Sequence, residues 1–248
     1  MKSEKNSKHS SKKGRQAGEK RATRWSFSGW ACERTCAFQY YGRFMLGVKD
    51  TMDEDNPAII RGNMFHKKQE NYLIGKINGV PREFLPFKDE LVGLKNAKPI
   101  VEQFWGVDAN WQPSKWGSWV VFKMDAAVLP TKKENTLWIQ DLKTGREKPM
   151  HADQASLGAC IGFALYPKVE EVQVEFWYAD QGIIRSYDYT RKELKRDTQR
   201  WIKEGERILT PRKKYLPSPS EDNCRWCPVS SKKGGPCHAW KKLQKGVS

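Results

Sequence analysis

Asp141 and Lys143 are separated by one residue near the end of a short stretch that begins with Trp138-Ile139. Trp and Ile favour a β-strand, and the following Thr144-Gly145 is typical of the turn that ends one. Side chains alternate between the two faces of a strand, so Asp141 and Lys143 lie on the same face. A carboxylate that can bind a divalent cation, beside an ammonium group, is suited to phosphate-ester hydrolysis. The alternative for an isolated Asp-x-Lys is a surface ion pair.

A second carboxylate, Asp125, lies within the apolar stretch 118–129, which also predicts a strand. An unpaired buried carboxylate is costly, so Asp125 requires a metal, an arginine or a hydrogen-bond donor. The polar residues 130–135 predict a hairpin that would make the two strands antiparallel neighbours. Asp125 and Asp141 lie at similar distances from that turn. We therefore expect the two carboxylates to lie nearly opposite each other and to share one cation.

The surrounding elements predict a mixed α/β domain with one further histidine near the acids. His66 and Glu70 are four residues apart on a predicted helix and share one face. A buried histidine that only packs its helix is the alternative for His66. The first predicted helix lies within 25–46, after a short extended segment and with Ser28 as N-cap. The other predicted helices are 61–74, 152–166 and 191–209. The other predicted strands are 100–105, 171–178 and 183–189. The region 75–99 has no clear pattern.

The 248-residue chain has a net charge of +16, and both ends are basic. Residues 1–24 hold nine Lys/Arg and two Glu, and residues 208–248 hold nine Lys/Arg and two acids. Two basic ends around a nearly neutral centre indicate a polyanionic partner, most simply DNA, although basic ends that only aid solubility are the alternative. We expect residues 1–24 to be disordered. With no signal sequence and no apolar window of about 18 residues, we expect a cytoplasmic protein without a membrane partner.

The six cysteines are unevenly spaced along the chain: Cys32, Cys36, Cys160, Cys224, Cys227 and Cys237. Cys224 and Cys227 form a Cys-x-x-Cys motif, and Cys237 follows after nine residues, which indicates a metal site. That site requires a fourth ligand, either His238 or a distant cysteine. Cys160 lies in an apolar helix and is expected to be a buried core thiol.

Together these motifs resemble the PD-(D/E)XK nucleases of the RecB-like branch, over residues 25–240. The matching features are a helical His66-x-x-x-Glu70 preceded by Gly62, strand Asp125, Asp141-x-Lys143 and helical Gln154. The segment 26–41 resembles the one that precedes this helix in members with an iron–sulfur cluster, which include CRISPR adaptation nucleases and AddB-type nuclease domains. The chain departs from the pattern at three points: Gly158 stands where the family has Tyr, Ala37 where it often has Pro, and the spacer before Cys237 is longer than usual.

The resemblance implies a restriction-endonuclease-like α/β core, in which helices flank a mixed central sheet, with a C-terminal cysteine region. The expected division is a basic arm (1–24), the nuclease core (25–210) and a cysteine segment (211–248) that closes onto the N-terminal helix. The implied activity is that of an Mg²⁺- or Mn²⁺-dependent DNA exonuclease acting on DNA ends or single strands. Its context would be recombination, repair or phage DNA processing, in a prokaryotic or phage-infected cell and with recombination or repair proteins as further partners.

The family's residue roles transfer to positions of this chain that match its motifs. The implied metal ligands are His66, Asp125, Asp141 and the Leu142 carbonyl, with Glu70 orienting His66 or binding a second ion. Lys143 would orient the attacking water or stabilise the transition state, and Gln154 would contact the phosphate. The implied ligands of a 4Fe–4S cluster are Cys36, Cys224, Cys227 and Cys237. Zn²⁺ is the alternative metal, and Cys32 is the rival of Cys36. The rival functions are a nucleic-acid-binding protein without catalysis and a scaffold of a recombination complex.

Overall fold

The computed structural model describes residues 22–49, 56–131 and 134–241, so most of the predicted basic arm lies outside the described residues. The elements in chain order are β1 (Trp25–Ser26), α1 (Phe27–Thr35), α2 (Ala37–Tyr40), the π-helix η1 (Tyr41–Met45), α3 (Pro57–Leu73), the 3₁₀ helix η2 (Arg82–Phe87), α4 (Lys88–Asn96), β2 (Ile100–Val107), β3 (Val120–Val128), β4 (Thr136–Lys143), α5 (Met150–Leu165), β5 (Glu171–Tyr178), β6 (Ile183–Thr190), α6 (Leu194–Leu209), α7 (Glu221–Arg225) and the 3₁₀ helix η3 (Ser231–Lys233).

The described strands form one mixed sheet in the order β1-β3-β4-β5-β6, with β2 also paired to β3. The pairs β1–β3 and β4–β5 are parallel, and the other three pairs are antiparallel. This confirms the predicted α/β class and the predicted hairpin between β3 and β4. Those two strands pair only over Ala126–Val128 and Trp138–Gln140. They therefore separate just where Asp125 and Asp141 would next face each other.

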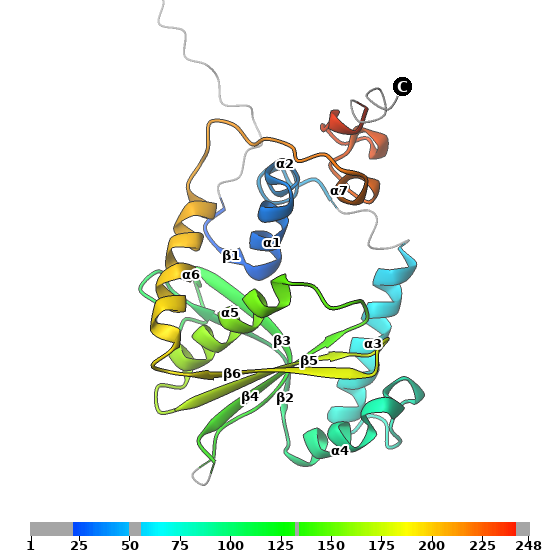
Figure 1. Ribbon diagram of the computed structural model, residues 1–248, viewed down its shortest axis with the longest axis vertical. Coiled ribbons are helices and arrows are strands. Elements are labelled where there is room, and N and C mark those ends of the chain that lie inside the picture. Colours follow the sequence, from blue (N-terminus) through cyan, green and yellow to red (C-terminus); the bar gives the residue numbers. More distant parts are fainter. Residues whose placement is uncertain (1–21, 50–55, 132–133, 242–248) are drawn as a thin grey trace, which may run out of the picture.

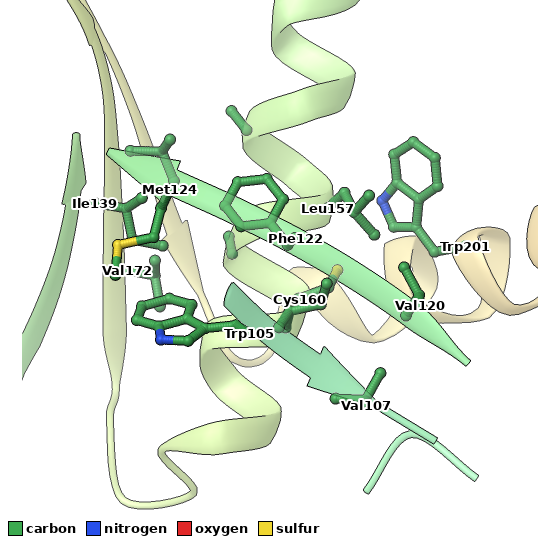
Figure 2. Close-up of a cluster of buried hydrophobic side chains, with 14 of the residues drawn as sticks. Trp105, Val107, Val120, Phe122, Met124, Ile139, Leu157, Cys160, Val172 and Trp201 are labelled. Carbon is green, nitrogen blue, oxygen red and sulfur yellow. The ribbon is translucent and has the colours of Figure 1, made fainter. Parts of the chain in front are cut away.

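Helices cover both faces of the sheet, and a hydrophobic core lies against each face (Figure 1). One core is shared with α1, α5 and α6, and it includes Phe122 and Met124 of β3 and Leu157 of α5 (Figure 2). The other core is shared with α3, η2 and α4. Cys160, only 1% exposed, belongs to the first core, as the sequence predicts.

The alternation of side chains along β3 shifts by one residue at Asp125. Met124 packs into the α5 core, whereas Ala126, two residues later, packs into the α3 core. Asp125 would pair with Glu102 if the β2–β3 register continued without a gap, and Glu102 has a left-handed φ of +52°. Such a conformation is uncommon for a non-glycine residue and is typical of functional sites. The local irregularity of both strands therefore lies at the predicted acidic site.

The first helical segment differs from its prediction in its cap and its continuity. The N-cap is Ser26 rather than Ser28, and the Ser26 hydroxyl accepts a hydrogen bond from the Gly29 N–H at 3.3 Å. The pairing of Trp25 with Val120 fixes where the chain leaves the sheet, and this places Ser26 at the helix start. The helix stops at Cys36, whose φ of −157° is extended, before α2 and η1 follow. The break separates Cys36 from the regular helix.

Other boundaries move by a few residues. Helix α3 begins at Pro57 rather than at Arg61, because Asn56 caps the Ala58 N–H and Pro57 is suited to the first helical position. Helix α6 begins at Leu194 rather than at 191. The region 75–99, which had no clear pattern, contains η2 and α4. Among the described residues, no helix is both long enough and apolar enough to cross a bilayer.

Candidate active site and cysteine cluster

His66 and Asp125 form the first half of the candidate active site, where α3 meets the sheet. The Nδ1 atom of His66 lies 3.0 Å from Oδ1 of Asp125, and the other carboxylate oxygen accepts a hydrogen bond of 2.7 Å from the Leu142 N–H. Burial lowers the pKa of His66, but Asp125, together with the nearby Asp141 and Glu102 carboxylates, raises it, and the pKa lies above its usual value. Asp125 thus receives the donors that its burial requires.

Glu102 joins this pair in a group of three ligating side chains. One ligand atom from each of His66, Glu102 and Asp125 lies within 4.8 Å of the others, the only such group of three or more among the described residues. An imidazole with two carboxylates fits a divalent cation such as Mn²⁺ or Mg²⁺. Glu102 is not among the site residues that the sequence predicts. Its only signal in the sequence is an acid within the largely apolar strand Ile100–Val107.

Asp141, Lys143 and Gln154 form the second half of the site. The Lys143 ammonium lies 2.5 Å from Oδ2 of Asp141 and donates to the Gln154 side-chain oxygen at 3.0 Å. The Gln154 amide donates to Oδ1 of Asp141 at 2.8 Å, which closes a ring of three contacts. Strand β4 supplies the first two residues and the first turns of α5 supply Gln154. Each side chain therefore holds the other two in place.

The environment of Asp141 is buried and charged. The residue is 6% exposed, and burial together with the nearby Asp125 carboxylate raises its pKa although Lys143 opposes the shift. The same Lys143 ammonium lies 5.2 Å from the centre of the Phe176 ring. A cation at this position would lower the pKa of Asp141 again, because it stabilises the ionised carboxylate.

The two halves are adjacent, but they do not form the single group that the sequence predicts. Asp125 acts electrostatically on Asp141, yet Asp141 is paired with Lys143 and is not in the His66 group. The Glu70 carboxylate lies 2.6 Å from the Lys67 ammonium, and its role toward His66 or a second ion stays a prediction. The Leu142 N–H, rather than its carbonyl, makes the contact that the structure shows at this site.

The other predicted cluster lies where α7 and the C-terminal segment approach α2 (Figure 1). The Phe38 N–H donates to the Leu216 carbonyl at 3.2 Å, and the Ser218 N–H to the Cys36 sulfur at 3.4 Å. Burial raises the pKa values of Cys227 and Cys237, and the neighbouring Cys36 thiol raises both further. The structure therefore brings Cys36 together with the C-terminal cysteines, and all are free thiols.

A close backbone approach holds these two chain ends together. A Cβ added to Gly42, in the π-helix η1, would lie 2.5 Å from a methyl group of Val229, which lies between Cys227 and Cys237. Cys32 also lies near Cys36 and Cys227, but burial raises its pKa to about 11 and its partner is the Arg43 side chain. His238 is exposed on the wall of an adjacent groove.

A mixed sheet between two helical layers, with Asp and Asp-x-Lys on neighbouring strands, defines a restriction-endonuclease-like domain. Residues 120–231 match the model of the PD-(D/E)XK nuclease superfamily. The matched stretch includes Asp125, Asp141, Lys143 and Gln154. Similarity to this superfamily over that stretch suggests a nuclease fold, and nucleases of this superfamily use divalent metals.

The fold is also similar to that of a solved protein. A crystal structure described as that of SSO0001 matches with a TM-score of 0.51 and 14% identity, and the match covers 89% of this chain and 88% of the other. Similarity at this identity shows the fold alone. The chain has no match among curated proteins.

Proposed function

We propose that this chain is a divalent-metal-dependent deoxyribonuclease, an exonuclease that hydrolyses phosphodiester bonds at DNA ends or in single-stranded DNA. The observation that carries the proposal is the closed arrangement of Asp141, Lys143 and Gln154 beside the His66–Asp125 pair. A protein that only binds DNA has no need for two buried acids at strand ends. The proposed context is DNA recombination, repair or phage DNA processing, with 25–210 as the nuclease core and 211–248 as the cysteine segment.

Each side chain of the site has a distinct task in this proposal. A divalent cation held by His66, Glu102, Asp125 and Asp141 would polarise a phosphoryl oxygen and lower the pKa of the attacking water. Lys143 places a fixed positive charge where negative charge grows on the phosphoryl group. Gln154 fixes the distance between Lys143 and Asp141, because its amide contacts both.

Two substitutions test the assignment, with cleavage and binding measured separately. Lys143→Ala and Asp125→Asn are each expected to reduce cleavage of end-labelled DNA in Mn²⁺ by about a hundredfold or more. Binding of the same DNA in Ca²⁺ should persist, because most affinity comes from the basic ends. Lys115→Ala, which removes an exposed charge from the β2–β3 loop, is the matched control and should cut normally. If the wild type cuts nothing, or Lys143→Ala cuts as the wild type does, a DNA-binding or scaffold role replaces the nuclease assignment.

For the cysteine site we propose a 4Fe–4S cluster held by Cys36, Cys224, Cys227 and Cys237. The support for this proposal is the layout of one cysteine near the N-terminal helix and three in the C-terminal segment, which the resembled nucleases share. Zn²⁺ remains the alternative, because four thiolates can hold either metal centre. Protein purified without oxygen should be brown and contain iron. Colourless protein with one zinc per chain would overturn the cluster and leave the nuclease proposal intact.

A further inference from the structure

An apolar groove of about 520 Å³ lies where the C-terminal segment meets α2. Its walls are mainly rings and small apolar groups, contributed by Phe38, Pro217, Pro219, Pro236, His238 and Ala239. Cys237, one of the proposed cluster ligands, also lines it. Because Phe38 comes from α2 and the rest from the C-terminal segment, the groove forms only when the two ends of the chain are joined.

Exposed cations lie near three parts of the C-terminal wall of this groove along the chain, whereas the exposed acids Glu221 and Asp222 follow Pro219. Residues 211–241 contain seven Lys/Arg and two acids. Lys213 and Lys214 precede the Pro217 wall, Lys232 and Lys233 precede Pro236, and Lys241 follows the Ala239 wall; all five are exposed. The interior is thus apolar, and the segment that forms most of it carries a net positive charge. Such a combination complements a ligand that has a flat apolar part joined to negative charges.

We propose that this groove seats an unpaired nucleobase of a single-stranded DNA substrate, whose phosphates lie against the flanking lysines. Every nucleobase has a π-face that stacks on rings without regard to sequence, and basic grooves follow the attached backbone. Duplex DNA hides those faces inside its stack, so the groove selects single strands. The proposal rests on the nuclease function above and names its substrate class.

The charge around the groove favours DNA over an apolar peptide. A proline-rich or aliphatic peptide would fill the cavity without using the lysines. The two ends of the chain are also the most basic parts of its sequence, whereas the region between them is nearly neutral. The groove lies at the meeting point of one of those ends with the folded core.

The first test compares ordinary and abasic single strands of equal length, bound in Ca²⁺ so that no cleavage occurs. Wild type should bind a thymidine 12-mer roughly five- to 100-fold more tightly than its abasic counterpart, the scale for stacking one base. Phe38→Ala should remove that difference, and Phe38→Tyr should keep it. Phe44→Ala removes another partly exposed phenyl ring, outside the groove, and is the matched control. Lys213→Gln should instead reduce the salt dependence of binding by about 0.7 in slope.

The second test needs no substitution and covers the case in which Phe38→Ala does not fold. Single strands that carry 5-iodouracil should crosslink, on irradiation of the full wild-type chain, to peptides that contain Phe38 or His238. Crosslinks outside the groove, or equal affinity for abasic and ordinary strands, would overturn the proposal and leave the groove as a protein contact. Failure of the nuclease function would appear separately, as base-dependent binding by a protein that cuts no DNA.

Discussion

Two regions of the molecule are built in opposite ways: the acidic site, formed by His66, Glu102, Asp125, Asp141, Lys143 and Gln154, and the cysteine site, formed by Cys36, Cys224, Cys227 and Cys237. At the acidic site, side chains from α3, β3, β4 and α5 already contact one another, so the fold fixes the ligands before a cation binds. At the cysteine site, the thiols are free and two have raised pKa values. The chain ends are joined there by the hydrogen bond from the Phe38 N–H to the Leu216 carbonyl and by two bonds that involve side chains, from the Ser218 N–H to the Cys36 sulfur and from the Asn223 side chain to the Thr35 carbonyl.

The difference indicates which property each metal would control. A preorganised site on central strands keeps its shape without its cation. Loss of the cation should therefore affect catalysis and leave folding intact. Thiols that join distant segments obtain their geometry from the metal, so its binding energy becomes folding energy. We therefore expect the acidic site to determine the rate and the cysteine site to determine stability.

The largest expected effect is on stability, from Cys227→Ser. It should remove the metal of the cysteine site and lower the free energy of unfolding by at least about 3 kcal/mol, because metal binding contributes directly to folding. Metal content and chemical unfolding under anaerobic conditions measure both effects. Cys160→Ala is the control thiol: it lies in the core and should leave the metal content unchanged. Equal metal content and stability in Cys227→Ser and wild type would show that the cysteine site does not determine stability.

Glu102→Gln tests the acidic site with a smaller expected effect. Its carboxylate lies with His66 and Asp125, so we expect Mn²⁺ affinity to fall by about tenfold to a hundredfold while folding is unchanged. Calorimetric titration with Mn²⁺ measures the affinity without DNA. Glu134→Gln, in the exposed turn between β3 and β4, is the matched control. Unchanged Mn²⁺ affinity would show that Glu102 serves only its ion pair with Lys123.

Sequence patterns predict the strands and the shared face of Asp141 and Lys143 well, because these depend on local alternation. The strand Glu171–Tyr178 is predicted to the residue, since Val172, Val174 and Phe176 alternate with polar neighbours. The same period places Asp141 and Lys143 on one face, where the structure has them in contact.

Features set by distant contacts are the ones that sequence reasoning misses. The role of Glu102 depends on a left-handed backbone that no local pattern indicates. Gly158, which stands where the resembled family has Tyr, has a physical reason of this kind. A Cβ there would lie 2.7 Å from the Phe122 ring of β3. Neither the sequence around Gly158 nor the sequence around Phe122 shows that these two residues pack together. The choice of Ser26 over Ser28 as a cap is likewise set by the pairing of β1 with β3.

Gly42→Val tests whether the close approach of Gly42 and Val229 supports the cysteine site. The added side chain would overlap Val229, and overpacking of this kind costs about 1–3 kcal/mol. Because Val229 lies between two proposed ligands, the variant should also bind the cluster metal less tightly. Gly93→Ala in α4 is the control: no atom lies within 4 Å of its added Cβ, and stability should rise slightly. Metal content and thermal unfolding of both variants decide the outcome, and a stable, fully loaded Gly42→Val would contradict the close approach.

The smallest expected effect is a pH dependence of stability near the acidic site. His151 in α5 is 8% exposed and its Nδ1 lies 2.6 Å from the Tyr178 hydroxyl. Burial lowers its pKa to about 4, and the charges of Lys143 and Lys148 act in the same direction. The folded-state pKa thus lies below the usual value of about 6.5, so the folded state favours the neutral imidazole. Its contribution to stability is complete above pH 6.5 and is lost as the pH falls towards 4.

His151→Gln isolates this contribution, because glutamine does not titrate and its carbonyl can still accept from Tyr178. Between pH 7 and pH 4.5, measured by urea unfolding with a chelator present, the wild type should lose on the order of 1 kcal/mol more stability than the variant. Parallel curves for His151→Gln and wild type would show that His151 is not held neutral. The charge of Lys143 would then act on the pKa of Asp141 but not on that of His151.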